Sequence, residues 1–357
     1  MKRVLHVYPQ INMGGTEMVF YNLIKFGNRK EFSYELLVRE EGNNETIFTD
    51  LGITIHHIPT TSEKEYYSHL VNFFKKERFD VVHVHMEPLL PAVMKAANAA
   101  GIPCRIAHSH NARVDIPQYL WPLFYFKHHP YEKYATHLFG CSELALKWLF
   151  PTRWSKGHVI YNGIDLSRFR FDAKIRAKVR LNNGIPDNAT VFINVGRCTE
   201  QKNQRFILDL AKERTDKNEL YIIIGDGPLY DELEKYRNVN HIDNVRMLGT
   251  RTDVAEWLNA ADIFLFPSIY EGLGIVAIEA EATGLIVLAT DTIPPEADMK
   301  LGNYHSLSLK DVAGWNKLMN LRPNDNAERL RISQNALNSQ FNISKVTQTV
   351  ENIYSIR

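Results

Sequence analysis

Short apolar runs rich in β-branched residues alternate with longer stretches of helical periodicity along the whole chain. Each run is too short for a helix and is followed by Gly, Asn, Ser or Pro, which favours a strand ending in a turn. Strands that alternate with helices predict βαβ units and mainly parallel sheets, an α/β fold. The predicted strands are 3–8, 34–38, 53–58, 81–85, 105–108, 137–141, 158–161, 191–195, 220–224, 245–248, 263–266 and 286–289.

A turn signal at Asn162-Gly163-Ile164-Asp165, followed by a polar, basic stretch without clear periodicity at 166–183, divides the chain in two. We predict an N-terminal domain at 1–165 and a C-terminal domain at 166–357, since a chain of 357 residues is long enough for about two domains. The last stretch, 324–357, predicts one or two helices, which pack on the second domain or return to the first. Two such domains predict a cleft between the carboxyl ends of their strands, where open α/β sheets bind ligands.

The composition excludes several classes of protein. Apolar residues make up 45% and charged residues 23%, as in a folded globular protein. A net charge of +1 provides no field for holding nucleic acid. Three distant cysteines without CxxC spacing indicate a reducing compartment. With no run of 18 apolar residues, and a start that predicts a strand and not a signal peptide, we expect a cytoplasmic protein with at most peripheral membrane contact.

Three glycine-containing loops connect predicted strands to predicted helices. They are Gly14-Gly15-Thr16-Glu17, Gly196-Arg197 through Lys202-Asn203, and Gly225-Asp226-Gly227-Pro228. Glycines at such a loop let backbone N–H groups approach a phosphate, and the helix N-terminus favours negative charge. Two cations five residues apart, Arg197 and Lys202, suit a diphosphate. Each loop also has a simpler interpretation, a tight turn or a solvated basic turn.

The segment 261–280 carries two acidic residues around a strand end. A strand ends at Pro267, a glycine loop follows, and a helix is predicted to start near Gly274. Glu271 precedes that helix, where a carboxylate also favours the helix dipole without any ligand. Glu279 lies inside a nearly apolar helix, so we expect it to be mostly buried and to need hydrogen-bond partners, which sugar hydroxyls would supply.

Taken in order, these loops resemble one family over nearly the whole chain. Gly14-Gly15-Thr16-Glu17, Asn162-Gly163-Ile164-Asp165, Gly196-Arg197 with Lys202-Asn203, Gly225-Asp226-Gly227-Pro228, and Glu271 eight residues before Glu279 are similar to the motifs of the GT-B glycosyltransferases of family four. His108-Ser109-His110-Asn111 after a strand resembles bacterial capsule and exopolysaccharide transferases. One departure is the loop 290–296, where many relatives carry Gly-Gly before Pro-Glu.

The resemblance implies two Rossmann-like domains and a retaining, metal-independent transfer of sugar from a nucleoside diphosphate donor, most widely a UDP-sugar. It implies a saccharide or lipid-linked saccharide acceptor in bacterial surface polysaccharide synthesis, and no cofactor. The implied catalytic residues are His110 facing the reacting sugar, Glu271, Arg197 and Lys202. The implied donor-binding residues are Gly15, Arg197, Lys202, Gly225, Arg251, Glu271, Gly272, Leu273, Gly274, Ile275 and Glu279. Within this set, Arg197 and Lys202 hold the diphosphate, Glu279 binds the ribose hydroxyls, and Arg251 contacts the base. No Asp-x-Asp pair is present to bridge a metal.

Two features keep alternative interpretations open. The pairs His83/His85 and His108/His110 each face one side of a strand and could suggest a metal site, but no further ligand is evident, which favours cleft-lining or partly buried structural histidines. The stretch 121–134 interleaves aromatic and basic residues. This pattern is typical of a peripheral membrane patch, and equally of an ordinary core helix with one solvent-exposed face.

Two other functions are compatible with parts of the sequence. Gly272-Leu273-Gly274-Ile275-Val276-Ala277, with Asp291 19 residues after Gly272, fits a nicotinamide-binding fingerprint, but four residues separate the strand from the first glycine and the loop with Arg197 and Lys202 is left without a role. A non-catalytic, GT-B-like binding subunit is the second alternative. The presence of Arg197, Lys202, Glu271 and Glu279 together argues against it.

Overall fold

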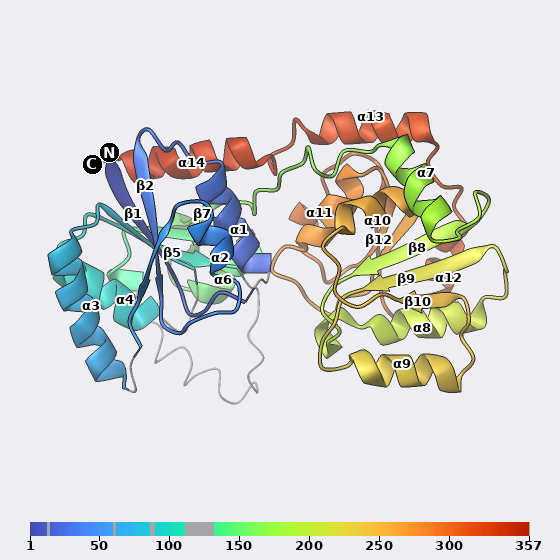
Figure 1. Cartoon of the computed structure of the whole chain (residues 1–357), viewed down its shortest axis with the longest axis horizontal. Helices are drawn as coiled ribbons and strands as arrows, with labels where there is room; N and C mark the ends of the chain where they lie inside the picture. The colour runs from blue at the N-terminus through green and yellow to red at the C-terminus, as the bar shows by residue number, and fades with distance from the viewer. Residues whose placement is uncertain (13–14, 60–61, 86–89, 111–131, 357) are drawn as a thin grey trace. The chain divides into compact units, whose positions relative to one another are not determined.

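The computed structural model of the chain describes residues 1–12, 15–59, 62–85, 90–110 and 132–356. It contains two compact units, one formed by Met1–Ile164 with Ile343–Arg357 and the other by Asp165–Asn342. Each unit is a parallel sheet with helices on its faces (Figure 1). No helix among the described residues has the length and apolar character needed to cross a bilayer.

The first unit is built on a seven-stranded sheet in the order β3-β2-β1-β4-β5-β6-β7. Its strands are β1 (Lys2–Tyr8), β2 (Phe32–Val38), β3 (Thr54–His57), β4 (Val81–Val84), β5 (Cys104–Ser109), β6 (His137–Gly140) and β7 (His158–Val159). Its helices are α1 (Gly15–Lys25), α2 (Thr46–Thr49), α3 (Glu63–Glu77), α4 (Leu90–Ala99), α6 (Glu143–Leu149), the 3₁₀ helix η4 (Trp154–Lys156) and α14 (Ile343–Ser355).

The two faces of the first sheet differ in chemistry, because alternate side chains of a strand point to opposite faces. Leu5 and Val7 of β1 belong to an apolar core with side chains of α3, α4 and α6. His6, between them, contacts Phe20 of α1 and Tyr354 of α14. The parallel register pairs His6 with His83 of β4, so the second face carries buried histidines.

The second unit is built on a six-stranded sheet in the order β10-β9-β8-β11-β12-β13, and all its pairs are parallel. Its strands are β8 (Thr190–Val195), β9 (Glu219–Ile224), β10 (Val245–Met247), β11 (Ile263–Phe266), β12 (Ile286–Thr290) and β13 (Tyr304–Leu307). Its helices are α7 (Ala173–Asn182), η5 (Glu200–Lys202), α8 (Gln204–Glu213), α9 (Tyr230–Val239), α10 (Val254–Ala260), α11 (Ile275–Ala282), η6 (Pro295–Ala297), α12 (Val312–Met319) and α13 (Asn326–Ala336). In Figure 1, α8 and α9 cover one face of this sheet, and α10 and α11 lie on the other.

The strand order of the second sheet reverses direction between β8 and β11. This is the order 3-2-1-4-5-6 of dinucleotide-binding domains, in which the loops at the reversal separate and leave room for a ligand at the carboxyl ends of the strands. The loops after β8 and β11 are the segments in which the sequence predicts Arg197, Lys202 and Glu271.

Every predicted strand is present, with ends shifted by at most two residues. The sequence missed β13, because Tyr304-His305-Ser306-Leu307 at the sheet edge is mostly half-buried and has no apolar run. The stretch 166–183, predicted to be a linker, instead contains α7, whose N-cap Asp172 accepts from the N–H groups of Lys174 and Ile175. The last helix, α14, packs in the first unit, where the Tyr34 hydroxyl donates to Glu351 at 2.5 Å.

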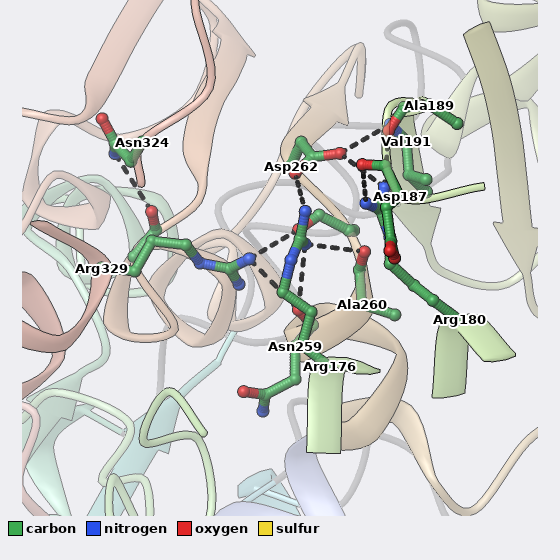
Figure 2. Close-up of polar contacts among 12 residues, drawn as sticks. Arg176, Arg180, Asp187, Ala189, Val191, Asn259, Ala260, Asp262, Asn324 and Arg329 are labelled. Atoms are coloured by element: carbon green, nitrogen blue, oxygen red, sulfur yellow. Dashed lines mark hydrogen bonds and ion pairs between the residues drawn. The ribbon is translucent and has the colours of Figure 1, made fainter. Parts of the chain in front are cut away.

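A buried cluster of arginines around Asp262 holds α7, α10 and α13 to the second sheet (Figure 2). Asp262, just before β11, accepts from Arg176 at 2.6 Å, from Arg180 at 3.1 Å and from the backbone N–H of Val191 at 2.8 Å. Arg329 of α13 is 1% exposed and donates to the carbonyls of Leu258, Asn259, Ala261 and Thr283. These bonds satisfy the carbonyls that the end of α10 leaves free.

We therefore expect Asp262→Ala to lower the free energy of unfolding by about 3–5 kcal/mol, because it leaves the buried guanidinium of Arg180 and the half-buried guanidinium of Arg176 without their carboxylate. Urea denaturation monitored by circular dichroism checks this. The control is Glu328→Ala, which removes an exposed ion pair with Arg331 in the same unit and should leave the midpoint unchanged. Equal midpoints for the two variants would contradict the structural role of Asp262.

Candidate functional site

The loops after β8 and β11 are bonded to each other at the carboxyl edge of the second sheet. The side chain of Gln201 donates to the carbonyl of Tyr270 at 2.9 Å, and the backbone N–H of Ile269 donates to the carbonyl of Gln201 at 2.8 Å. Asn203, at a left-handed φ of 52°, donates from its amide to the carbonyl of Pro267. The two segments therefore form one surface.

The loop after β9 fits against the loop after β8 only because it carries glycines. A Cβ on Gly225, whose φ is 137°, would lie 2.0 Å from the carbonyl oxygen of Gly196. A Cβ on Gly227, whose φ is 156°, would lie 2.6 Å from the carbonyl oxygen of Cys198. Gly225 also donates its N–H to the carbonyl of Gly249 at 2.8 Å, so the end of β10 belongs to the same edge.

Lys202 and Glu271 form the principal charged contact of this edge. Lys202 Nζ lies 2.5 Å from Glu271 Oε1, and the two side chains are 19% and 9% exposed. The Lys202 ammonium also lies 5.6 Å from the centroid of the Phe266 ring. The structure thus brings together two residues predicted to contact the diphosphate and the sugar, and the charge of each neutralises that of the other.

The other two predicted cations lie at the same edge but differ in their contacts. Arg197 is exposed, and no carboxylate of the described residues pairs with its guanidinium. Arg251, in the loop after β10, makes a two-point ion pair with Asp253 at 2.8 and 2.6 Å. Arg197 therefore presents an uncompensated positive charge, whereas the charge of Arg251 is compensated.

The start of α11 supplies backbone N–H groups next to Glu271. Gly274 caps the helix at a φ of 90°, and a Cβ there would meet the Phe266 ring at 2.9 Å. Leu273 is buried, whereas Gly272 and Ile275 are half-buried. The first N–H groups of a helix have no partner within it and favour a negatively charged or hydroxyl-bearing ligand.

The two carboxylates of α11 have different surroundings. Glu281 is fully buried and accepts from the backbone N–H groups of Met299 and Leu301, so its role is structural. Glu279 is half-buried, less than the sequence predicts, and no hydrogen bond to its carboxylate is found among the described residues. Burial raises the pKa of Glu279 to about 8, and the positive charge of Arg168 opposes that shift only partly.

The loop after β12, where the sequence departs from the glycine pair of relatives, is fixed by hydroxyl groups. Thr290 donates to the carbonyl of Ser268 at 2.5 Å, and Thr292 donates to the same carbonyl at 3.2 Å. These bonds could not be predicted from the sequence, because a lone threonine after a strand is common. They tie a third loop to the end of β11.

In the first unit, the predicted residues Gly15 and His110 lie at loop positions that follow strands. Gly15 begins α1, is exposed, and has open space where a Cβ would stand. His110 follows β5 and is 7% exposed. Burial lowers the pKa of His110 to about 4, although a contact with Asn162 acts in the opposite sense. Gly14 and most of 121–134 lie outside the described residues.

The histidine pairs lie deeper than the sequence predicts. His83, His85, His108 and His110 are all buried, not cleft-lining or partly buried, and His6 joins them as a fifth member. Two groups of three, His6/His83/His85 and His85/His108/His110, have ring nitrogens within 4.8 Å of one another. The sequence missed His6, although a histidine between Leu5 and Val7 on a central strand was a usable signal.

A cavity of about 590 Å³ lies at the opposite edge of the second sheet, lined by Arg176, Asp262, Asn324 and neighbouring residues. Two of its charged groups, Arg176 and Asp262, are already paired with each other in the cluster of Figure 2. It lies at the amino ends of β8 and β11, whereas ligands of such sheets bind at the carboxyl ends. We therefore assign the functional site to the carboxyl edge.

Comparison with known proteins agrees with this geometry. The model of "Glycosyl transferases group 1" matches residues 176–337, and that of "Glycosyltransferase Family 4" matches residues 13–168. A Bacillus subtilis (strain 168) protein that carries the name glycosyltransferase EpsF is 31% identical over 333 residues, covering 88% of this chain and 86% of its own length. This chain therefore belongs to the family 4 glycosyltransferases, and it is an enzyme of that class.

Two further proteins resemble the chain over most of its length. An Escherichia coli enzyme named UDP-Gal:alpha-D-GlcNAc-diphosphoundecaprenol alpha-1,3-galactosyltransferase is 27% identical over 313 residues, which cover 79% of this chain and 78% of that protein. The crystal structure of Anabaena HepE in complex with UDP-glucose has a TM-score of 0.83 at 17% identity and full coverage of both chains. The fold is thus the predicted GT-B fold, and the nicotinamide-dependent alternative is set aside.

We expect Gly225→Ala to destabilise the second unit by about 3 kcal/mol, because the new methyl group adds a clash with Gly196 to the backbone strain. The control is Gly184→Ala. Gly184 has a φ of 60°, and no atom lies within 4 Å of the new carbon. This substitution should therefore lower the stability by only about 1–2 kcal/mol, the cost of the backbone strain alone. Thermal unfolding of both variants compares them. Equal losses would show that the loops do not depend on their close approach.

Proposed function

We propose that the chain transfers a sugar with retention of configuration from a UDP-sugar, without a metal, to a saccharide or lipid-linked saccharide acceptor in the synthesis of a bacterial surface polysaccharide. The observation that carries this proposal is the Lys202–Glu271 pair at the reversal point of the second sheet, beside the uncompensated Arg197. Departure of a nucleoside diphosphate develops negative charge, and fixed cations at that position stabilise it.

Each predicted residue has a role consistent with its surroundings. Arg197 and Lys202 hold the diphosphate and stabilise it as it leaves with the electron pair of the anomeric C–O bond. Glu271, with the backbone of Gly272–Ile275, holds the donor sugar once Lys202 turns toward the phosphates. No hydrogen bond to the Glu279 carboxylate is found in the described part of the chain, and the ribose hydroxyls would supply one.

The remaining residues extend the site. Gly225 lets the loop after β9 approach the nucleotide, and Arg251 contacts the base after leaving Asp253. Gly15 and His110, both in the first unit, approach the phosphates and the reacting sugar.

The names of two relatives support the proposed donor and acceptor. The Escherichia coli enzyme is named for a UDP-sugar donor and a diphosphoundecaprenol-linked acceptor, and a Staphylococcus aureus relative, 25% identical over 82% of this chain, is named a capsular polysaccharide biosynthesis glycosyltransferase. We accordingly place the reaction at the inner face of the plasma membrane. The acceptor approaches as a lipid-linked sugar, and the transferred sugar bonds to its hydroxyl oxygen.

Replacing Lys202 with alanine should lower turnover by about tenfold or more, equivalent to about 1.4 kcal/mol of lost transition-state stabilisation. The measurement is release of UDP from a UDP-sugar in the presence of acceptor. Lys212→Ala removes an exposed cation of α8 that bonds Asn240, and it serves as the control with wild-type turnover. Wild-type turnover in Lys202→Ala would remove Lys202 from the mechanism.

Binding of UDP should tighten as the pH rises from about 7 to 9. With its pKa raised to about 8, the Glu279 carboxyl is largely protonated at neutral pH in the free protein, and two ribose O–H groups stabilise its ionised form. Binding therefore releases a proton, and the affinity rises until the pH passes that pKa. Calorimetry at several pH values measures this rise. In Glu279→Gln the profile should be flat, and an equally steep profile there would contradict the ribose assignment.

A further inference from the structure

The buried histidines of the first unit form two separate hydrogen-bonded chains. In the first, His6 Nδ1 lies 2.7 Å from His85 Nε2, and His85 Nδ1 lies 3.0 Å from His110 Nε2. In the second, the Tyr354 hydroxyl lies 2.7 Å from His83 Nδ1, and His83 Nε2 lies 3.0 Å from His108 Nδ1. The rings of His83 and His85 stack with centroids 4.1 Å apart, but no hydrogen bond among the described residues joins the two chains.

The distances within the chains are those of hydrogen bonds and not of a metal site. Two nitrogens on a tetrahedral zinc, each about 2.0–2.1 Å from the ion, lie about 3.3 Å apart. The nitrogens that face each other here are 2.7 and 3.0 Å apart. These rings are also 0–7% exposed, and no carboxylate or cysteine joins either group of three. An N–H donating to a ring nitrogen accounts for every one of these contacts.

The rings of the first chain are neutral, because burial lowers the pKa of each of them far below neutrality. A neutral imidazole has one N–H donor and one acceptor nitrogen. If both nitrogens of His85 are bonded, one must donate and the other accept. The protons of the whole chain therefore point in a single direction.

The two ends of the chain decide that direction. His6 Nε2 and His110 Nδ1 are both buried without a hydrogen bond of ordinary geometry among the described residues, but His110 lies beside the Asn162 side chain, whose Oδ1 can accept, whereas no acceptor for His6 Nε2 is found in that part of the chain. A buried N–H without an acceptor is rarer in proteins than a buried acceptor without a donor. His6 therefore carries its proton on Nδ1 and donates to His85 Nε2. His85 in turn carries its proton on Nδ1 and donates to His110 Nε2.

We propose that His6 and His85 are positioning residues that hold His110 in one orientation and one tautomer, with its proton on Nδ1. Its Nε2 is occupied by the N–H of His85, so Nδ1–H is the only group that His110 offers as a donor. Neither His110 Nδ1 nor Asn162 Oδ1 makes a hydrogen bond of ordinary geometry within the described residues, although the two side chains are near each other. A sugar hydroxyl that reached this position would accept from His110 Nδ1–H and donate to Asn162 Oδ1.

The consequence for transfer rests on the proposed function, because it takes His110 to face the reacting sugar. The tautomer itself does not rest on it. The two parts are therefore tested by separate measurements on the full-length protein.

The tautomer is tested by NMR of the full chain with ring-¹⁵N-labelled histidine, with His110→Gln assigning the signal. We expect an Nδ1–H tautomer in the wild type and mixed tautomers in His85→Leu. His83→Gln, a substitution on the same strand in the other chain, should leave the His110 signal unchanged. An Nε2–H tautomer in the wild type overturns the proposal, and this result does not depend on whether a variant folds. One equivalent of tightly bound metal in the purified protein would overturn it equally.

The consequence is tested by transfer kinetics. We expect His85→Leu to lower kcat by about tenfold or more while changing the affinity for UDP by less than about twofold, and His85→Gln, which keeps a donor, to recover part of the rate. If His110→Ala loses transfer but His85→Leu does not, the positioning role fails and the proposed function stands. If His110→Ala transfers like the wild type, the assignment of His110 fails instead.

Discussion

The ion pair between Lys202 and Glu271 is the interaction on which the account of the second unit depends. It joins the loop after β8 to the loop after β11, at the point where the strand order reverses, and its two charged atoms are in direct contact. A carboxylate that is only 9% exposed needs such a partner. In the proposed function, a diphosphate that attracts Lys202 also releases Glu271 for the donor sugar.

The two units handle buried polar groups in opposite ways. In the second unit charges are kept and compensated, as in the Lys202–Glu271 pair and in the arginine cluster around Asp262. In the first unit no counter-ion of the buried histidines is found among the described residues, so burial makes the rings neutral, and hydrogen bonds with one another and with Tyr354 satisfy most of their nitrogens. The charged edge of the second sheet suits a diphosphate, whereas the neutral histidines of the first unit suit hydroxyl groups.

Much of the fold could be predicted from the sequence, because parallel strands followed by glycine loops leave a strong local pattern. Lys202 and Glu271 were expected in one donor site because the family resemblance implies it, and the strand order that makes their loops neighbours could not be predicted. The histidine chains could not be predicted, because they depend on β1 lying beside β4 in a register that pairs His6 with His83. Tyr354 reaches His83 across 271 residues of sequence, which no local pattern records.

The two glutamates of α11 show the same limit on a smaller scale. Both lie on a short apolar helix. The rotation of that helix relative to Met299 and Leu301 determines which of the two glutamates is fully buried. The sequence predicted burial for Glu279, whereas Glu281 is the residue that lies in the core. Periodicity identifies an apolar helix, but on a helix with almost no polar face it cannot identify the buried side.

The central claim is that the carboxyl edge of the second sheet binds a nucleoside diphosphate through cations of the protein. Calorimetric titration of the full chain with UDP, GDP, ADP and NAD, each with and without EDTA, tests it most directly. We predict that UDP binds with the same affinity in both conditions and that NAD does not bind. Binding of NAD alone, or loss of UDP binding in EDTA, would contradict the account.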